Sequence, residues 1–65
     1  MLSLDKEVDL TCIETDKVAK GKIVRIQGNR VDVALDQGGL LISLYMKKPG
    51  LHVGSQSGLE FVMKS

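Results

Sequence analysis

Five cations fall between residues 17 and 30 with no acid among them, and their side chains are the best placed in the chain to contact a ligand. They are Lys17, Lys20, Lys22, Arg25 and Arg30. Cationic side chains on one strand face of a small barrel can contact phosphates. Residues 1–16 carry one cation against five acids, so the formal net charge of the whole chain is only +1. Long-range attraction for a polyanion is therefore small.

Aromatic side chains are scarce, which limits the chemistry that these cations can support. Proteins that bind single-stranded nucleic acids also stack bases on aromatic rings. The chain has one Phe and one Tyr, and Phe61 is in phase with the expected core, so Tyr45 alone is left for a surface. The candidate binding residues are Lys20, Lys22, Arg25, Arg30 and Tyr45.

Nucleophile, general-base and metal-ligand patterns are missing. His52 is the only histidine and Cys12 the only cysteine, so a metal site would need carboxylates from distant loops. A nucleophilic pair would have to use His52 with a loop serine, and no third group is in place to orient the imidazole. We predict no catalysis, no metal and no cofactor, with His52 in a surface or packing role.

Cys12 follows Val8 and Leu10 on the apolar face of residues 7–13, which predicts a buried structural thiol. A lone free thiol fits a reducing cytoplasm. No apolar run approaches the ~20 residues of a membrane span, and the amino terminus does not resemble a signal peptide. We therefore expect a cytoplasmic protein without membrane insertion.

These residues are expected to lie on or between short β-strands. The expected strands cover residues 7–13, 18–27, 30–35, 40–46, 51–53 and 59–63, with a helical turn left open at residues 43–48. Gly28-Asn29 joins two of them as a tight hairpin, and Gly54 to Gly58 has the composition of a flexible loop. The residues expected to be buried together are Val24, Val31, Val33, Leu35, Ile42, Leu44, Leu59 and Phe61.

The whole chain, residues 1–65, is predicted to be a single all-β domain. Five or six short strands must close on themselves, because an open sheet of this size would leave both edges uncovered. The expected architecture is a small antiparallel barrel. Because the acidic first strand should lie beside the basic second one, cross-strand pairing of opposite charges would account for most of the charge asymmetry. A small aliphatic core also makes a homodimer plausible.

Two segments resemble the PilZ-like barrels of bacteria. Residues 22–26 leading into Val31-Asp32-Val33 look like paired central strands of that family, and residues 54–62 are similar to its closing strand. The resemblance implies a six-stranded barrel and, in many members, binding of cyclic di-GMP. The hairpin at residues 22–35 equally resembles OB-like and SH3-like barrels of ribosomal and initiation-factor type.

The ligand motifs of the PilZ family are absent from this chain. The family uses Arg-x-x-x-Arg ahead of the barrel, whereas Arg25 and Arg30 are five residues apart inside the hairpin. Residues 36–39 have no Ser at the place that the family's second motif requires. We therefore predict a non-enzymatic binding or adaptor module that acts through protein contacts and does not bind cyclic di-GMP strongly. The alternative is an RNA-binding OB/SH3-like barrel that uses the Lys17–Arg30 hairpin.

Overall fold

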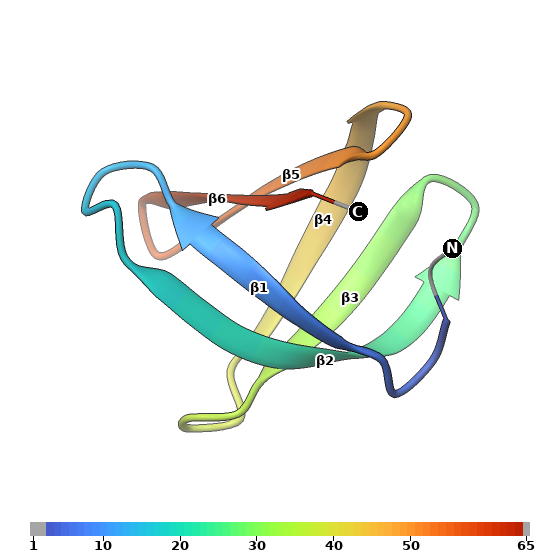
Figure 1. Ribbon diagram of the computed structural model, residues 1–65, viewed down its shortest axis with the longest axis horizontal. Coiled ribbons are helices and arrows are strands. Elements are labelled where there is room, and N and C mark those ends of the chain that lie inside the picture. Colours follow the sequence, from blue (N-terminus) through green and yellow to red (C-terminus); the bar gives the residue numbers. More distant parts are fainter. Residues whose placement is uncertain (1–2, 65) are drawn as a thin grey trace.

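The computed structural model describes residues 3–64, which form six β-strands and no helix. The strands are β1 (Glu7–Cys12), β2 (Val18–Gln27), β3 (Arg30–Leu35), β4 (Leu41–Lys48), β5 (Leu51–Gln56) and β6 (Leu59–Lys64). Each strand pairs antiparallel with the next, and β1 pairs with β6 to close a barrel (Figure 1). The predicted small antiparallel all-β barrel is confirmed. Residues 3–64 contain no helical stretch with the length and apolarity of a membrane span.

Strands β4 and β5 run two and three residues past their expected ends. Strand β5 continues through Gly54 to Gln56, so the predicted loop at residues 54–58 is wrong, and the turn before β6 is confined to Ser57 and Gly58. Both turn residues have a positive φ, 54° for Ser57 and 78° for Gly58. Strand β4 continues to Lys48 with a register shift after Met46, which excludes a helical turn at residues 43–48.

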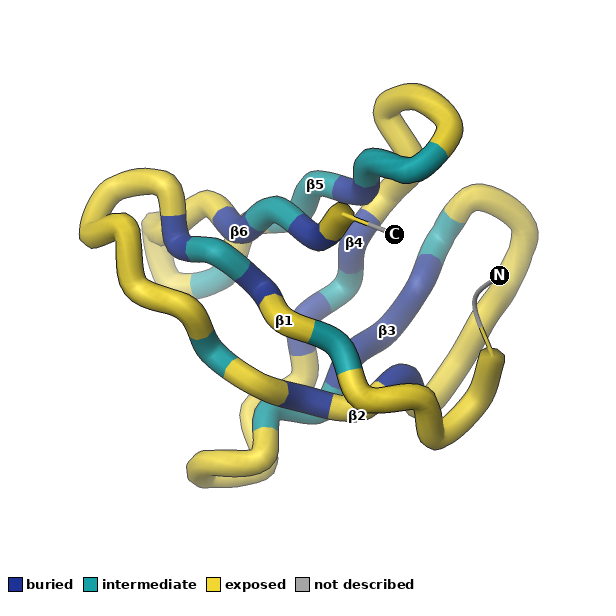
Figure 2. Tube along the Cα trace, viewed as in Figure 1, coloured by how far each residue is buried: buried dark blue, intermediate teal, exposed yellow. Residues whose placement is uncertain are grey.

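The core lies inside the barrel and is almost entirely aliphatic. Its buried members are Leu10, Cys12, Ile23, Val31, Val33, Ile42, Leu44, Phe61 and Met63. In Figure 2 the buried positions lie within the strands, and the turns are exposed. Five of the eight predicted core residues are buried, and Leu35 packs partly buried against the cluster. The predicted burial of the Cys12 thiol is confirmed.

Val24 is exposed because β2 contains a bulge. Ile23 pairs with Val33 and Arg25 with Asp32, so Val24 is an extra residue with no partner in β3. Ile23 is wholly buried, whereas Val24 is 46% exposed. The predicted burial of Val24 is therefore wrong. The same shift sets the direction of Arg25, which after the bulge lies on the side of the strand occupied by Asp32.

Leu59 is the second incorrect core assignment. It shares its strand phase with the buried Phe61 and Met63, but it begins β6 directly after the turn and stays 37% exposed. There it lines a mainly apolar depression at one mouth of the barrel together with Val18 and Leu35. Leu59 is therefore on the expected side of β6, but it lies too close to the end of the barrel to be covered by the core.

Candidate binding face

The basic run of β2 divides into two groups with different surroundings. Lys20 and Lys22 lie directly opposite Asp9 and Glu7 in the β1–β2 register. Cross-strand neighbours of opposite charge stabilise each other modestly, by about 0.2–1 kcal/mol per pair. The predicted pairing of an acidic first strand with a basic second strand is confirmed at these positions. Each of these two lysines therefore has an acid as its cross-strand neighbour, which offsets part of its positive potential.

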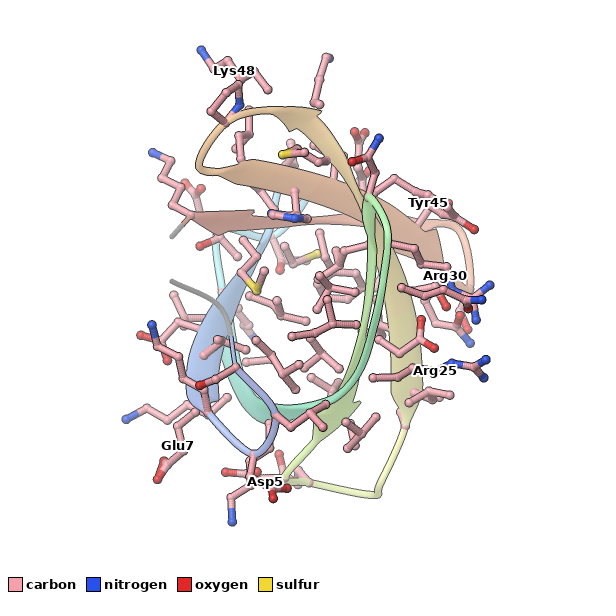
Figure 3. The ribbon with its side chains drawn as sticks, turned by 90° about the vertical axis from the view of Figure 1, so that its right-hand side faces the viewer. Asp5, Glu7, Arg25, Arg30, Tyr45 and Lys48 are labelled. Carbon is pink, nitrogen blue, oxygen red and sulfur yellow. The ribbon has the colours of Figure 1, made fainter. Side chains whose placement is uncertain are left out.

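The other three candidate residues come together on the outer surface of β2, β3 and β4. Arg25 lies opposite Asp32, Asp32 opposite Ser43, and Arg30 opposite Tyr45. Since Val31 and Val33 point into the barrel, the alternation of β3 directs Arg30 and Asp32 outward. Figure 3 shows Arg25, Arg30 and Tyr45 along one side of the barrel. We call Arg25, Arg30, Asp32, Ser43 and Tyr45 the Arg–Tyr face.

Asp32 is the anchor of the Arg–Tyr face. Although it points away from the core, its side chain is only 4% exposed. Arg30 donates two hydrogen bonds to this carboxylate, from Nε to Oδ1 and from Nη2 to Oδ2, each 3.1 Å long. A bidentate pair of this kind fixes the plane of the guanidinium. Arg30 is therefore held in one orientation beside the exposed ring of Tyr45.

The electrostatics of the face follow from this pair. The hydrogen bonds from Arg30 hold the pKa of Asp32 below its usual value, with further lowering by Ser43 and Arg25, while burial acts in the opposite direction. The same contact with Asp32 raises the pKa of Arg30. Asp32 is thus ionised at neutral pH and neutralises part of the positive charge of the two arginines.

A shallow groove of about 540 Å³ continues the face onto β5 and β6. It is lined by Ser43, Tyr45, Val53, Gly54, Ser55 and Glu60. Tyr45 stands at the boundary between the arginines and this groove, with 55% of its surface exposed. The aromatic ring is therefore available to a partner that also contacts the arginines.

The contact between Arg30 and Asp32 could have been predicted from the sequence. Arg30 and Asp32 share the outer side of an unbroken alternating strand, and residues two apart on one side of a strand are neighbours. The groove beside Tyr45 had no such signal, because it depends on how β4, β5 and β6 pair.

Asp32 should link stability to pH with a defined sign. Because its pKa is lowered in the folded state, its contribution to stability is complete above the usual carboxyl pKa and is lost as the pH falls through the folded-state value. We expect the wild type to lose more unfolding free energy than Asp32→Asn between about pH 6 and about pH 3. Urea unfolding at a series of pH values measures this difference. Asp36→Asn, in the exposed β3–β4 turn, is the matched control. Equal losses in wild type and Asp32→Asn would contradict the assigned role.

Within residues 3–64, no group of three His, Cys, Asp or Glu side chains gathers so that it could hold a metal ion. Ser55 does not form a nucleophilic pair with His52 on β5, because successive side chains of a strand alternate and these two point to opposite sides. His52 is buried, in agreement with a packing role.

Fold and face together define a closed six-stranded antiparallel barrel with a fixed arginine and an exposed tyrosine on its outer surface. No known protein family matches the chain, and neither a curated protein nor a solved structure does.

Proposed function

We propose that this chain is a non-enzymatic binding module, PilZ-like in outline, that acts as an adaptor through protein contacts made by the Arg–Tyr face. The observation that carries the proposal is the bidentate Arg30–Asp32 pair beside the exposed Tyr45. Tyr and Arg are enriched among the residues that dominate protein interfaces. A side chain already held in place loses less conformational entropy on binding. The face therefore offers a partner two anchors, of which Arg30 is already oriented.

The PilZ likeness is supported by the number of strands and by the closed antiparallel barrel, which are the features that the resemblance implies. An OB fold is instead a five-stranded Greek-key barrel. Cyclic di-GMP is not the ligand that we propose, because Arg25 and Arg30 are fixed on strands and Arg30 is already paired with Asp32. We place the protein in a bacterial cytoplasm, in keeping with the free thiol of Cys12.

The RNA-binding alternative has less support from the same residues. Lys20 and Lys22 face carboxylates, Arg30 is neutralised by Asp32, and Tyr45 stands alone as an exposed aromatic in the described chain. Stacking on one ring supplies only about 1–3 kcal/mol per base. Every strand of the closed barrel already has a neighbour on both sides, so a homodimer could not form by pairing of free strand edges. The homodimer stays a prediction, which sedimentation velocity can test.

A photocrosslinker at position 45 tests the proposal. We expect Tyr45→p-benzoylphenylalanine, irradiated in a lysate of the source cells, to give a discrete adduct that survives nuclease and is destroyed by protease. The matched control carries the crosslinker at Gln37, in the exposed β3–β4 turn. Adding Arg30→Ala to the position 45 variant should reduce the adduct at least tenfold, as expected for loss of a dominant contact.

The outcomes separate the candidate functions. A nuclease-sensitive adduct whose yield falls steeply with salt would overturn the protein-binding proposal in favour of RNA. Equal adducts from positions 45 and 37 would show that the Arg–Tyr face is not the contact surface. Saturable chemical-shift changes centred on Arg25 and Arg30 during a titration with cyclic di-GMP would contradict the exclusion of that ligand.

A further inference from the structure

Two methionines and a histidine form one row across the inner side of β4, β5 and β6. His52 lies directly opposite Met46 on one neighbouring strand and directly opposite Met63 on the other. His52 and Met63 are buried, and Met46 shares the phase of the buried Ile42 and Leu44. All three side chains therefore start on the inner side of the barrel. Directly opposite residues have Cβ atoms about 4.5–5.5 Å apart, which places both thioethers within reach of the imidazole.

The imidazole of His52 lacks a hydrogen-bond partner at one of its ring nitrogens. Its side chain is 4% exposed, and the Nδ1 atom is buried with no hydrogen-bond partner. Buried polar atoms in folded proteins are nearly always paired, so an exception calls for an explanation such as an ordered water, a bound ion or a functional role. In the register the imidazole has a methionine on each side, and a methionine sulfur is only a weak hydrogen-bond acceptor. The sulfur is, however, a good ligand for a soft metal ion.

The donor set determines which ion suits the row. Two thioethers and one neutral imidazole are soft or borderline ligands, which favour Cu⁺ and disfavour the hard cations Mg²⁺ and Ca²⁺. Zn²⁺ in proteins is held by thiolates, imidazoles and carboxylates, and thioethers are not among its usual ligands. Methionine sulfurs were not among the partners expected for His52 from the sequence, which were Cys, His and carboxylate side chains.

The row also has a route for entry. Met63 is fully buried, whereas Met46 is 40% exposed near the β4–β5 turn. An ion would thus first meet the sulfur of Met46 and then reach His52 and Met63. Cys12, the other soft donor inside the barrel, is on β1 opposite Phe61 of β6 and does not belong to the row.

We propose that Met46, His52 and Met63 form a binding site for a soft monovalent metal ion such as Cu⁺. The ion would be bound through the two methionine sulfurs and His52 Nδ1. The site is independent of the Arg–Tyr face, which lies on the outer surface of the barrel. It requires no change of strand register, because the three residues already face one another.

A titration with Ag⁺, a redox-inert ion of the same class, tests the site. The protein carries Cys12→Ala to remove the competing thiol, together with ¹³C-methyl-labelled methionine. We expect saturation at one equivalent, with shifts of the methyl signals of Met46 and Met63 and of the His52 ring. The third methionine, Met1, serves as an internal reference. A parallel titration with Zn²⁺ should leave the two methyl signals in place.

Volume-conserving variants keep the test independent of folding. Met46→Leu and Met63→Leu retain the apolar bulk but remove one sulfur each. Each variant should bind Ag⁺ at least tenfold more weakly. The same loss is expected for Cu⁺, measured by anaerobic competition with bicinchoninate. The NMR spectrum should show that the barrel is still folded. Unchanged affinity in both folded variants would overturn the proposal. So would shifts confined to Met1, or the lack of any saturable shift.

Discussion

Gly54→Ala is expected to destabilise the barrel by about 3 kcal/mol or more, at or beyond the upper end of the usual cost of overpacking. A Cβ atom at this position would overlap the carbonyl oxygen of Ser43 and lie 2.9 Å from Leu44 Cδ2. The first contact is with backbone, which cannot move aside without disturbing β4. Since a small domain has a total stability near the low end of about 5–15 kcal/mol, a loss of this size removes a large part of it.

Urea unfolding followed by circular dichroism measures the effect of Gly54→Ala. Ser55→Ala, at the exposed neighbouring position, is the matched control and should stay within about 0.5 kcal/mol of the wild type. A Gly54→Ala variant as stable as this control would show that β4 and β5 approach each other less closely than described.

Phe61→Ala is the second large effect, with an expected loss of about 3–5 kcal/mol. Phe61 is the only phenylalanine in the chain, and it lies opposite Gly54 on β5 and Cys12 on β1. Its side chain belongs to the buried core cluster, so truncation to alanine would leave a cavity there. Thermal or urea unfolding gives the magnitude.

Phe61→Leu separates the loss of apolar volume from the loss of the aromatic ring. Leucine retains much of the apolar bulk, so this variant should be destabilised by clearly less than Phe61→Ala. A cooperative Phe61→Ala variant with an unchanged midpoint would place Phe61 outside the core. Equal losses in the two variants would point instead to a requirement for the aromatic ring itself.

Regular alternation made part of this fold predictable from sequence. Residues 30–35 alternate without interruption, so both the inward valines and the outward Arg30 and Asp32 follow directly. The bulge at Val24 could not be foreseen, because a bulge is defined by the pairing of β2 with β3. Only that pairing shows that Ile23, and not Val24, belongs to the core.

Gly54 illustrates a different limit of sequence reasoning. Its small polar neighbours have the composition of a loop, yet the glycine is needed where β5 passes close to β4. Close approach between strands leaves no mark in local composition. The candidate face was likewise predictable in its members Arg25, Arg30 and Tyr45, but their gathering around Asp32 depends on the three-strand register.

The sequential order of neighbours in the barrel has a consequence for how the chain folds. Every pairing except that of β1 with β6 joins strands adjacent along the chain, and such hairpins form in about 1–10 μs. Only the β1–β6 contact must close a loop that spans nearly the whole chain, and its entropic cost is not offset until Thr11 and Cys12 have reached their partners on β6. Pairing between strands adjacent along the chain keeps most contacting residues close in sequence, which favours rapid folding. The meander is therefore expected to be in place while the barrel is still open, and closure to be the last event.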